Sequence, residues 1–160
     1  MRKEEQSSNA PAAAVNDRPR RRMKMNDRNK LQPGIKGTSR TSVDAGITAL
    51  SMGSGEIEVL ATPAMAALME AAAVNCVKPY LPSNETSVGV HIETSHIAAT
   101  PPGMGVRAEA TLEGVEGRRL FFRVEAYDDR EKIGEGRHER VIVDREKFLG
   151  KVNKKCAGPS

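Results

Sequence analysis

The sequence is poor in aromatic residues, with no Trp, three Phe and two Tyr among 160 residues. It also has no apolar run near the roughly 18 residues that a membrane-spanning helix needs, and no apolar segment typical of a secretory signal follows its N-terminus. These absences disfavour a membrane-spanning or secreted protein. We therefore expect a cytoplasmic protein that has no contact with a membrane.

Cysteine and histidine are too few and too scattered for a disulfide framework or a zinc site. Cys76 lies in an apolar segment and Cys156 in the polar C-terminal tail, so reduced thiols are expected. The three histidines, His91, His96 and His138, show no zinc-binding spacing. The sequence therefore predicts no metal.

Charge and composition divide the chain into three parts. The net charge is +4, and the segment RPRRRMK at residues 18–24 holds much of the excess. Residues 1–32 are polar and lack apolar periodicity, which predicts a disordered basic arm before a folded domain at 33–150 and a flexible tail at 151–160. The arm has no aromatic residues, so a solvated arm is favoured over one that binds nucleic acid.

One long apolar helix is predicted within residues 61–77, which read ATPAMAALMEAAAVNCV. Thr62 is expected at the N-cap and Pro63 at the first helical position, and Pro79 ends the helix near Lys78. The segment is apolar nearly all round, which predicts burial nearly all round. Glu70 is its only charged residue, and a buried carboxylate without a partner costs of the order of several kcal/mol. It must therefore be paired, neutralised or functional.

Extended segments surround this helix in the sequence. Those after it show the period-two alternation of antiparallel strands joined by short turns. Strands are predicted before the helix at 35–43 and 55–62, and after it at 86–103, 104–114, 119–127 and 133–143, with a short final helix at 144–150. One apolar helix and an antiparallel sheet predict an α+β fold, in which the helix lies on the concave face of a curved sheet of about five strands.

Three polar side chains stand out against this framework. Thr62 begins the helix, Glu70 lies in its middle, and His96 precedes a Pro-Pro-Gly turn. Each has an ordinary structural explanation when taken alone: an N-cap, a carboxylate paired with a nearby donor, and a satisfied strand histidine. Together they offer the hydroxyl, carboxylate and imidazole that acyl transfer or hydrolysis requires.

Three motifs carry a resemblance to a known family. VLATPAMAALMEAAA, TSVGVHIETSHIAATPPGM and IGEGRHERVIV resemble, in order and spacing, the fluoroacetyl-CoA thioesterase-like group of hotdog-fold proteins. The resemblance extends over about residues 35–148. It implies a hotdog fold and a homodimer or larger assembly whose sheets join edge to edge, with acyl-CoA sites at the dimer interface.

The resemblance also implies an activity. Thr62, Glu70 and His96 match the catalytic residues of the family, and Gly89 matches the glycine whose backbone N–H faces the thioester carbonyl. Gly89 and His96 have opposite parity on an ideal strand, which a β-bulge can reset. The implied function is hydrolysis of an acyl-CoA, with coenzyme A as part of the substrate and no resident cofactor. Whether Glu70 and Thr62 activate water or form an acyl-enzyme stays open.

Two further expectations concern the substrate. The phosphates of coenzyme A predict a basic rim, and the candidates, for which ordinary surface charge is the alternative, are Arg118, Arg119, Arg137 and Arg140. His138 is interpreted as structural. The fluoroacetate-specific enzyme has an aromatic lid before the catalytic threonine, whereas residues 51–62 here contain no aromatic residue. This departure predicts a small to medium acyl group other than fluoroacetyl.

The sequence leaves three other functions to compare with hydrolysis. A non-catalytic acyl-CoA binding module would keep the same pocket, but the presence of Thr62, Glu70 and His96 together favours a hydrolase. A hotdog dehydratase would need an Asp-to-His pair at short spacing, which is absent. The basic arm as a nucleic-acid tether would give binding that depends strongly on salt.

Overall fold

The computed structural model of the protein describes residues 27–156. The elements in chain order are η1 (Asp27–Lys30), β1 (Lys36–Ser42), α1 (Ala49–Met52), α2 (Thr62–Val77), η2 (Lys78–Tyr80), β2 (Glu85–His96), β3 (Gly105–Glu116), β4 (Arg119–Asp128), β5 (Lys132–Asp144) and α3 (Arg145–Asn153). The predicted long helix, the four long strands after it and the final helix are all present.

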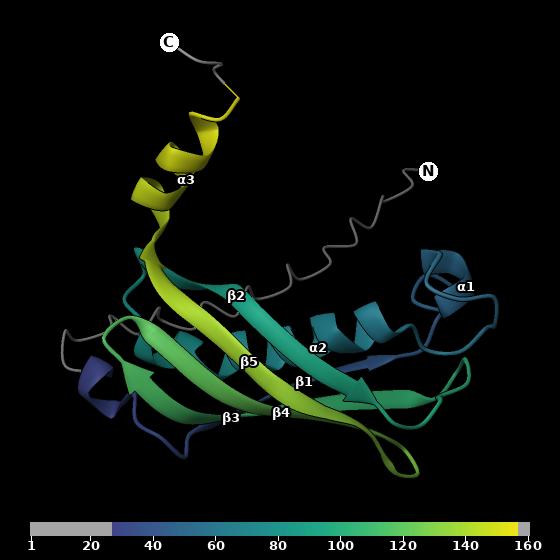
Figure 1. The fold of residues 1–160 in the computed structure, drawn as a ribbon. Helices are drawn as coiled ribbons and strands as arrows, with labels where there is room; N and C mark the ends of the chain where they lie inside the picture. The colour runs from purple at the N-terminus through teal and green to yellow at the C-terminus, as the bar shows by residue number, and fades with distance from the viewer. Residues whose placement is uncertain (1–26, 157–160) are drawn as a thin grey trace, which may run out of the picture.

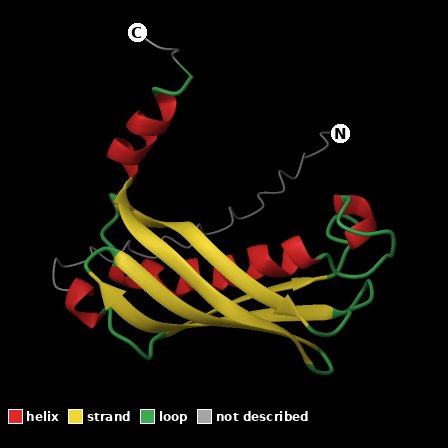
Figure 2. Ribbon diagram, in the orientation of Figure 1, coloured by secondary structure: helices red, strands yellow, loops and turns green. Residues whose placement is uncertain are grey.

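The five strands form one antiparallel sheet in the order β1-β3-β4-β5-β2. The sheet curls around α2, which crosses its concave face (Figures 1 and 2). The predicted α+β architecture is therefore confirmed. This order leaves β1 and β2 at the two edges of the sheet. Residues 97–104 connect the end of β2 to the start of β3.

The core lies between α2 and the concave face of the sheet. Met65, Met69 and Ala72 on the helix are fully buried, as are Leu112 and Val124 on the facing strands. The buried helix positions recur every three or four residues, and burial alternates along β3 and β4, as the periods of a helix and a strand require.

β1 comes unusually close to the helix at one glycine. A Cβ atom added at Gly37 would overlap the backbone of Ala72 and Cys76. Only a residue without a side chain allows this approach. Gly37 therefore sets how tightly the edge strand packs on α2.

The expectation that α2 is buried nearly all round is wrong for the single chain. Ala67 and Asn75 are exposed, and 42% of the Glu70 side chain is accessible. The reason is that one sheet covers only one side of a helix. The opposite, Ala-rich side remains open along its length.

Residues 55–62 do not form the predicted strand. Their only bridge links Leu60 to Thr48, and the chain before it forms the unpredicted helix α1. Thr48 caps α1 by accepting a bond from the Ser51 N–H at 3.2 Å, and Gly53 ends it at a φ of 67°. Backbone bonds then close the segment on itself, since the Leu50 N–H bonds to the Ile57 carbonyl. The alternation of polar and apolar residues in this segment is typical of a strand, but the segment does not pair with any strand of the sheet.

The predicted domain limits differ slightly from the structure. Leu31 lies in the core, before the expected start at residue 33, and α3 continues to Asn153, beyond the expected end at 150. The rest of the predicted basic arm and the end of the predicted tail lie outside the described residues. Among the helices that the structure describes, none has the length and apolarity needed to cross a membrane.

Candidate active site

Thr62 occupies the first helical position of α2, one residue later than the predicted N-cap. Ala61 is the N-cap, with extended φ and ψ of −69° and 138°, and no side chain caps this end. The Thr62 hydroxyl is therefore not used by the helix. It lies instead 2.9 Å from Nδ1 of His96, the last residue of β2.

The His96 ring can accept a proton from this hydroxyl in the neutral tautomer that carries its own proton on Nε2. Burial lowers the pKa of His96, and the weaker influence of the Ala98 backbone opposes it, so the ring is neutral near pH 7. Nε2 is buried and has no hydrogen bond of ordinary geometry to the described residues. A neutral imidazole whose Nδ1 faces a hydroxyl is the pairing that activates a nucleophile.

A pocket of about 280 Å³ opens beside this pair. The chain segments that line it come from α1 and the loop after it, the start of α2, and the residues that follow β2. Its lining residues other than the pair are Ala49, Ser54, Val59, Leu60, Ile97, Ala98 and Ala99. Apart from Ser54 these side chains are apolar, so the pocket suits an acyl group.

Glu70 lies two turns along α2 and faces the middle of β5. Its Oε2 is 3.3 Å from Nη1 of Arg140 and 3.9 Å from Nε2 of His138. The carboxylate is half-exposed rather than fully buried, so the predicted burial is corrected, while the predicted need for a partner is met by Arg140.

Arg140 is buried and holds a network beneath Glu70. Its Nε donates to the Ser87 hydroxyl at 2.9 Å and its Nη2 to the Ser87 carbonyl at 2.8 Å. Its Nη1 also lies 3.0 Å from His138 Nε2, and His138 Nδ1 lies 2.7 Å from the His91 carbonyl. Because a guanidinium only donates and a carbonyl only accepts, His138 carries its proton on Nδ1 and is neutral.

The charge state of this network follows from its burial. Burial lowers the pKa of His138, and the nearby Arg140 charge lowers it further, whereas the His91 carbonyl opposes both. Burial also lowers the pKa of Arg140, and Glu70 opposes that shift. The guanidinium stays protonated in proteins, so Glu70 faces a permanent buried cation.

Gly89 on β2 lies next to the cluster formed by Glu70, His138 and Arg140. A Cβ atom at Gly89 would lie 2.8 Å from Glu70 Oε2 and 3.2 Å from His138 Cε1. The pairing register of β2 with β5 shifts between Gly89 and His91, which is the kind of irregularity that can reset the parity of the strand. The absence of a side chain leaves the carboxylate accessible from this side.

The structure thus brings the four predicted site residues together as two pairs, Thr62 with His96 and Glu70 with Gly89. The pairs are separated by eight residues of α2, a rise of about 12 Å. No hydrogen bond or ion pair between described residues joins them. Within one chain the predicted set is therefore split between the start and the middle of the helix.

The four arginines predicted for coenzyme A phosphates lie in different places. Arg140 is inside the protein, so it is not part of an exposed rim. Arg118 is exposed in the turn between β3 and β4. Arg119 pairs with Glu139 at 2.6 Å on the convex face.

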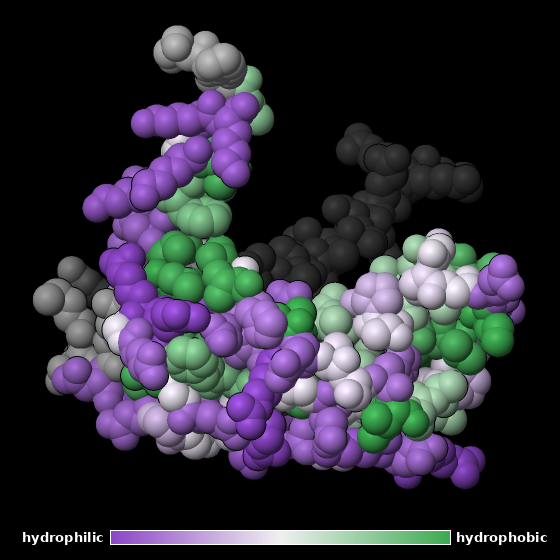
Figure 3. Space-filling model, in the orientation of Figure 1, coloured by the Kyte–Doolittle hydropathy of each residue, from purple (hydrophilic) through white to green (hydrophobic). Residues whose placement is uncertain are grey.

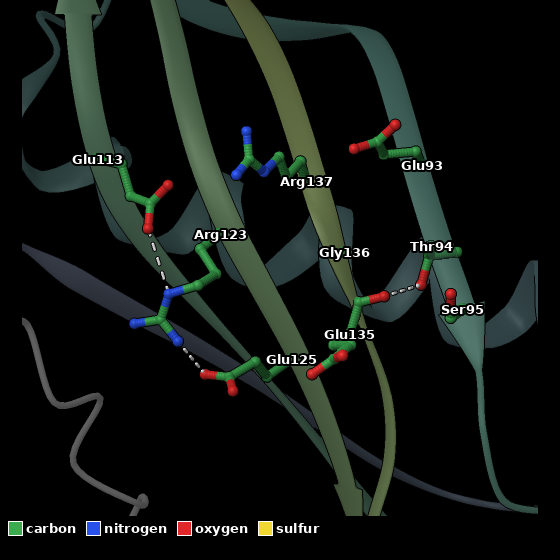
Figure 4. Close-up of a pocket in the computed structure, with 9 residues that line it drawn as sticks. All are labelled: Glu93, Thr94, Ser95, Glu113, Arg123, Glu125, Glu135, Gly136 and Arg137. Carbon is green, nitrogen blue, oxygen red and sulfur yellow. Dashed lines mark hydrogen bonds and ion pairs between the residues drawn. The ribbon is translucent and has the colours of Figure 1, made fainter.

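Arg137 lines a hollow of about 520 Å³ on the convex face, with α2 behind the sheet (Figure 4). Four glutamates line this hollow, and Arg123 is already paired with Glu113 at 3.2 Å and with Glu125 at 2.7 Å. Such a lining repels phosphate more than it attracts it. The hollow is also separated by the sheet from both predicted pairs.

A third hollow, of about 440 Å³, lies between the C-terminal half of α2 and the first residues of β2. Val74, Val77 and Leu81 supply apolar walls, and Ser87, the partner of Arg140, lies at its edge. Ser87 therefore belongs both to this groove and to the network beneath Glu70. Sequence reasoning did not identify the groove, because its walls come from segments that are apart in the chain.

Sequence reasoning also missed the role of Ser87 and placed Arg140 on the surface. One signal was available: His138, Arg140 and Ile142 share the parity of β5 that faces the core. Two charged or polar residues on a core-facing stripe indicate a buried network. Among the described residues, no group of three His, Cys, Asp or Glu side chains is arranged to hold a metal ion.

Comparisons with known proteins agree with this architecture. The family described as fluoroacetyl-CoA-specific thioesterase matches residues 43–146, which include both pairs. The fluoroacetyl-CoA thioesterase of Streptantibioticus cattleyicolor is 50% identical over 98 residues, which are 61% of this chain and 70% of that protein.

Solved structures extend the likeness to the fold. A threonine-to-serine mutant of the fluoroacetyl-CoA thioesterase in complex with acetyl-CoA is 40% identical, with a TM-score of 0.74 over 78% of this chain and 98% of that one. A hypothetical protein of Thermus thermophilus, a thioesterase superfamily member, is 32% identical, with a TM-score of 0.74 over 79% of this chain and 94% of that one. The predicted hotdog fold and the predicted resemblance are confirmed: the chain belongs to the fluoroacetyl-CoA-specific thioesterase family.

Proposed function

We propose that this thioester hydrolase cleaves small to medium acyl-CoA molecules, with Thr62, His96, Glu70 and Gly89 at its site. The observation that carries the proposal is the 2.9 Å contact between the Thr62 hydroxyl and the neutral His96 ring. A helix-capping threonine would have its hydroxyl on the backbone. This one faces a base instead, beside an apolar pocket.

The chemistry divides between the two pairs. His96 takes the proton of the attacking hydroxyl and returns it to the departing coenzyme A thiolate. The Gly89 N–H stabilises the oxyanion that forms on the thioester carbonyl. Glu70, held by Arg140, orients water for the step that releases the free acid. The sum is acyl-CoA plus water giving carboxylic acid plus coenzyme A thiol.

The same residues also permit a direct route, in which water attacks the thioester without an acyl-threonine. Rapid quenching followed by intact mass measurement separates the two. A mass increase equal to the acyl group, lost in Thr62→Ala, supports the acyl-enzyme. Turnover without such a species at any time supports direct attack.

A homodimer explains why one chain holds two half-sites. When two β2 edges pair in antiparallel fashion, the end of one strand lies beside the first half of the other. Thr62 and His96 of one protomer then approach Glu70 and Gly89 of its partner. The Ala-rich open side of α2 lies next to this junction. The composite site, like the predicted cytoplasmic location, is a proposal.

The lining of the pockets supports the substrate class. The 440 Å³ groove beyond Glu70 exposes mainly apolar surface, and the 280 Å³ pocket beside Thr62 has apolar side chains together with polar atoms along its walls. No aromatic residue occurs in the loop that borders the first of them. The space therefore suits an aliphatic acyl group longer than fluoroacetyl.

The first experiment measures thiol release from acyl-CoAs ranging from acetyl to dodecanoyl, together with aromatic acyl groups, using Glu70→Gln as the control. Turnover that the variant loses supports the proposal. Binding of acyl-CoA without turnover by the folded wild-type protein would instead support the non-catalytic binding module.

A mixing experiment tests the composite site. Glu70→Gln and His96→Ala proteins are each expected to be inactive. After mixing and subunit exchange, half of the dimers contain both chains, and one of the two sites in each is intact, so about a quarter of wild-type activity should return. If mixing restores nothing although mass measurement shows mixed dimers, the two half-sites do not combine across the interface.

A further inference from the structure

The exposed large apolar side chains of the described residues gather at three places. One is a patch beside the Thr62–His96 pocket, which we call the loop patch: Leu50, Met52, Ile57 and Ile97. The second is Val90 on the β2 edge, and the third is one side of α3, formed by Phe148, Leu149 and Val152. Single exposed apolar residues are ordinary, but groups of them mark surfaces that another molecule covers.

Helix α3 is not covered by the rest of residues 27–156, the part of the chain that the structure describes. It is nine residues long, and none of its residues is buried. It stands away from the body of the protein as a continuation of β5, beyond the β2 edge (Figure 1). A helix this short is marginal in water unless its apolar side packs on something. Phe148, Leu149 and Val152 are 37%, 57% and 41% exposed, so the described residues of this chain leave this side of the helix open.

Strand pairing fixes where α3 lies relative to β2. Asp144, at the end of β5, pairs with Glu85, the first residue of β2. Helix α3 therefore begins beside the start of β2, whereas His96 and the loop patch lie at its other end. Figure 3 shows apolar surface at both ends of this face, at the base of α3 and over α1.

Antiparallel pairing of two β2 edges brings these opposite ends together. The start of one strand then lies beside the end of the other, so α3 of one protomer reaches the loop patch of its partner. Val90 lies near the middle of the pairing. The three exposed apolar groups are thereby all covered by one two-fold arrangement.

The charges of the two surfaces are complementary. Helix α3 and the residues after it carry Arg145, Lys147, Lys151, Lys154 and Lys155, against the single carboxylate of Glu146. The loop patch is flanked by Glu56 and Glu58, which are both exposed. Opposite charges around an apolar centre favour this pairing over one between two like surfaces.

We propose that α3 of each protomer packs on the loop patch of its partner and covers the mouth of the partner's Thr62–His96 pocket. The proposal rests on the edge-to-edge dimer of the proposed function. In this arrangement the exposed Phe148 of one protomer lies over the partner's pocket, next to residues 51–62, which contain no aromatic residue. Covering the pocket removes water from around the thioester.

Cys156 allows a direct test, because it is exposed near the end of α3, whereas Cys76 is buried. A benzophenone maleimide attached to Cys156 is irradiated in dimers formed from ¹⁵N-labelled and unlabelled chains. Cross-links that join a labelled chain to residues 50–58 or 97 of an unlabelled chain are expected. Cross-links confined to one chain, or inter-chain links that avoid the loop patch while the dimer persists, overturn the proposal.

Substitutions test the contact itself. Leu149→Asp should remove the inter-chain links and lower kcat/KM about tenfold, as loss of a central apolar contact does. Asn153→Asp, which adds the same charge at the end of α3, is the matched control and should change neither. Lys151→Glu should weaken the links, and a second change, Glu58→Lys, should restore them. Failure of the pair to compensate, together with unchanged links in Leu149→Asp, refutes the docking.

Two further outcomes are distinguishable. Cross-linking does not require turnover, so links without thiol release would refute the proposed activity and leave the docking standing. If the protein instead sediments with phosphatidylserine vesicles through Leu149 and gives no inter-chain links, α3 is a membrane-surface helix and the proposal is wrong.

Discussion

Arg140 Nη1 lies 3.3 Å from Glu70 Oε2, and this contact joins helix α2 to strand β5 on the concave face of the sheet. The guanidinium is anchored from below by Ser87 and by His138. Its position is therefore fixed before any substrate arrives. A carboxylate in an apolar helix is thus accounted for by a buried cation that the strand β5 supplies.

Replacing Arg140 with Lys should misplace Glu70 although it keeps the charge. Lysine cannot reproduce the forked bonds to Ser87 and the bond to His138. We expect turnover to fall at least about tenfold, as for a displaced catalytic group, and thermal stability to decrease. Arg119→Lys is the matched control, because the pair with Glu139 is on the surface and worth little. Equal kinetics for the two variants would contradict a positioning role for Arg140.

Replacing Gly89 with Ala should impair activity more than folding. The new Cβ would lie 2.8 Å from Glu70 Oε2, the end of a half-exposed side chain that can move aside, and 3.2 Å from Cε1 of the buried His138, which must shift slightly. Turnover should drop sharply, whereas the unfolding midpoint should fall only a little. Gly114→Ala is the control, since its Cβ would make only ordinary contacts with Phe121. Full turnover in Gly89→Ala would show that the carboxylate does not act beside this glycine.

Activity should depend on pH through His96. Burial lowers its pKa below the ordinary 6.5, and only the neutral ring accepts the hydroxyl proton. The acid limb of the kcat/KM profile is therefore expected to have its midpoint below pH 6.5. A midpoint at or above pH 7 would mean that another group limits the reaction.

The stability of the fold should also decrease as the pH is lowered. Burial lowers the pKa of both His96 and His138, so the unfolded chain binds more protons than the folded one between the folded-state pKa and 6.5. The free energy of unfolding then decreases as the pH drops below 6.5 and stops changing, for these groups, below their folded pKa. Urea unfolding at several pH values measures this, and His138→Gln should reduce the slope.

Replacing Gly37 with Ala should destabilise the fold strongly. The added Cβ would overlap backbone atoms of Ala72 and Cys76, which cannot move without shifting the helix. Overpacking of this kind costs typically about 1–3 kcal/mol. Gly150→Ala, where a Cβ meets nothing, is the control and should be neutral or slightly stabilising. Similar unfolding midpoints for both variants would show that β1 can retreat from α2.

The two thiols should differ sharply in reactivity. Burial raises the pKa of Cys76 to about 11, and its Sγ donates to the Ile35 carbonyl at 3.4 Å. Cys156 is exposed. One thiol per chain should therefore react with maleimide at neutral pH, and mass measurement should place it at Cys156. Rapid labelling of both would show that the packing of β1 on α2 opens readily.

The short-range pattern of the sequence was sufficient for most of the secondary structure. The apolar stretch from Thr62 to Val77 and the alternation after Glu85 carry their own periods, so the helix and the later strands were correctly predicted. The exceptions were residues 55–62, which form no strand, the unpredicted helix α1, and residues 97–103, which lie beyond the end of β2. The alternation of letters in residues 55–62 is not matched by alternating burial, since Ile57 is exposed like its neighbours Glu56 and Glu58. No local signal distinguishes such a loop from a strand.

The sequence by itself determined the fold class and the order of the long helix and the strands after it, and it supplied the candidate site residues. The parity of β5 is consistent with the inward position of His138 and Arg140, but Arg140 was predicted on the surface and only the structure showed that it is buried. Only the tertiary structure decided the partners: Thr62 with His96, Arg140 with Glu70, and an open rather than buried side of α2. Periodicity describes neighbours a few residues apart along the chain, whereas each of these contacts joins residues more than thirty positions apart. Their geometry depends on how the sheet curls around the helix, which no local pattern specifies.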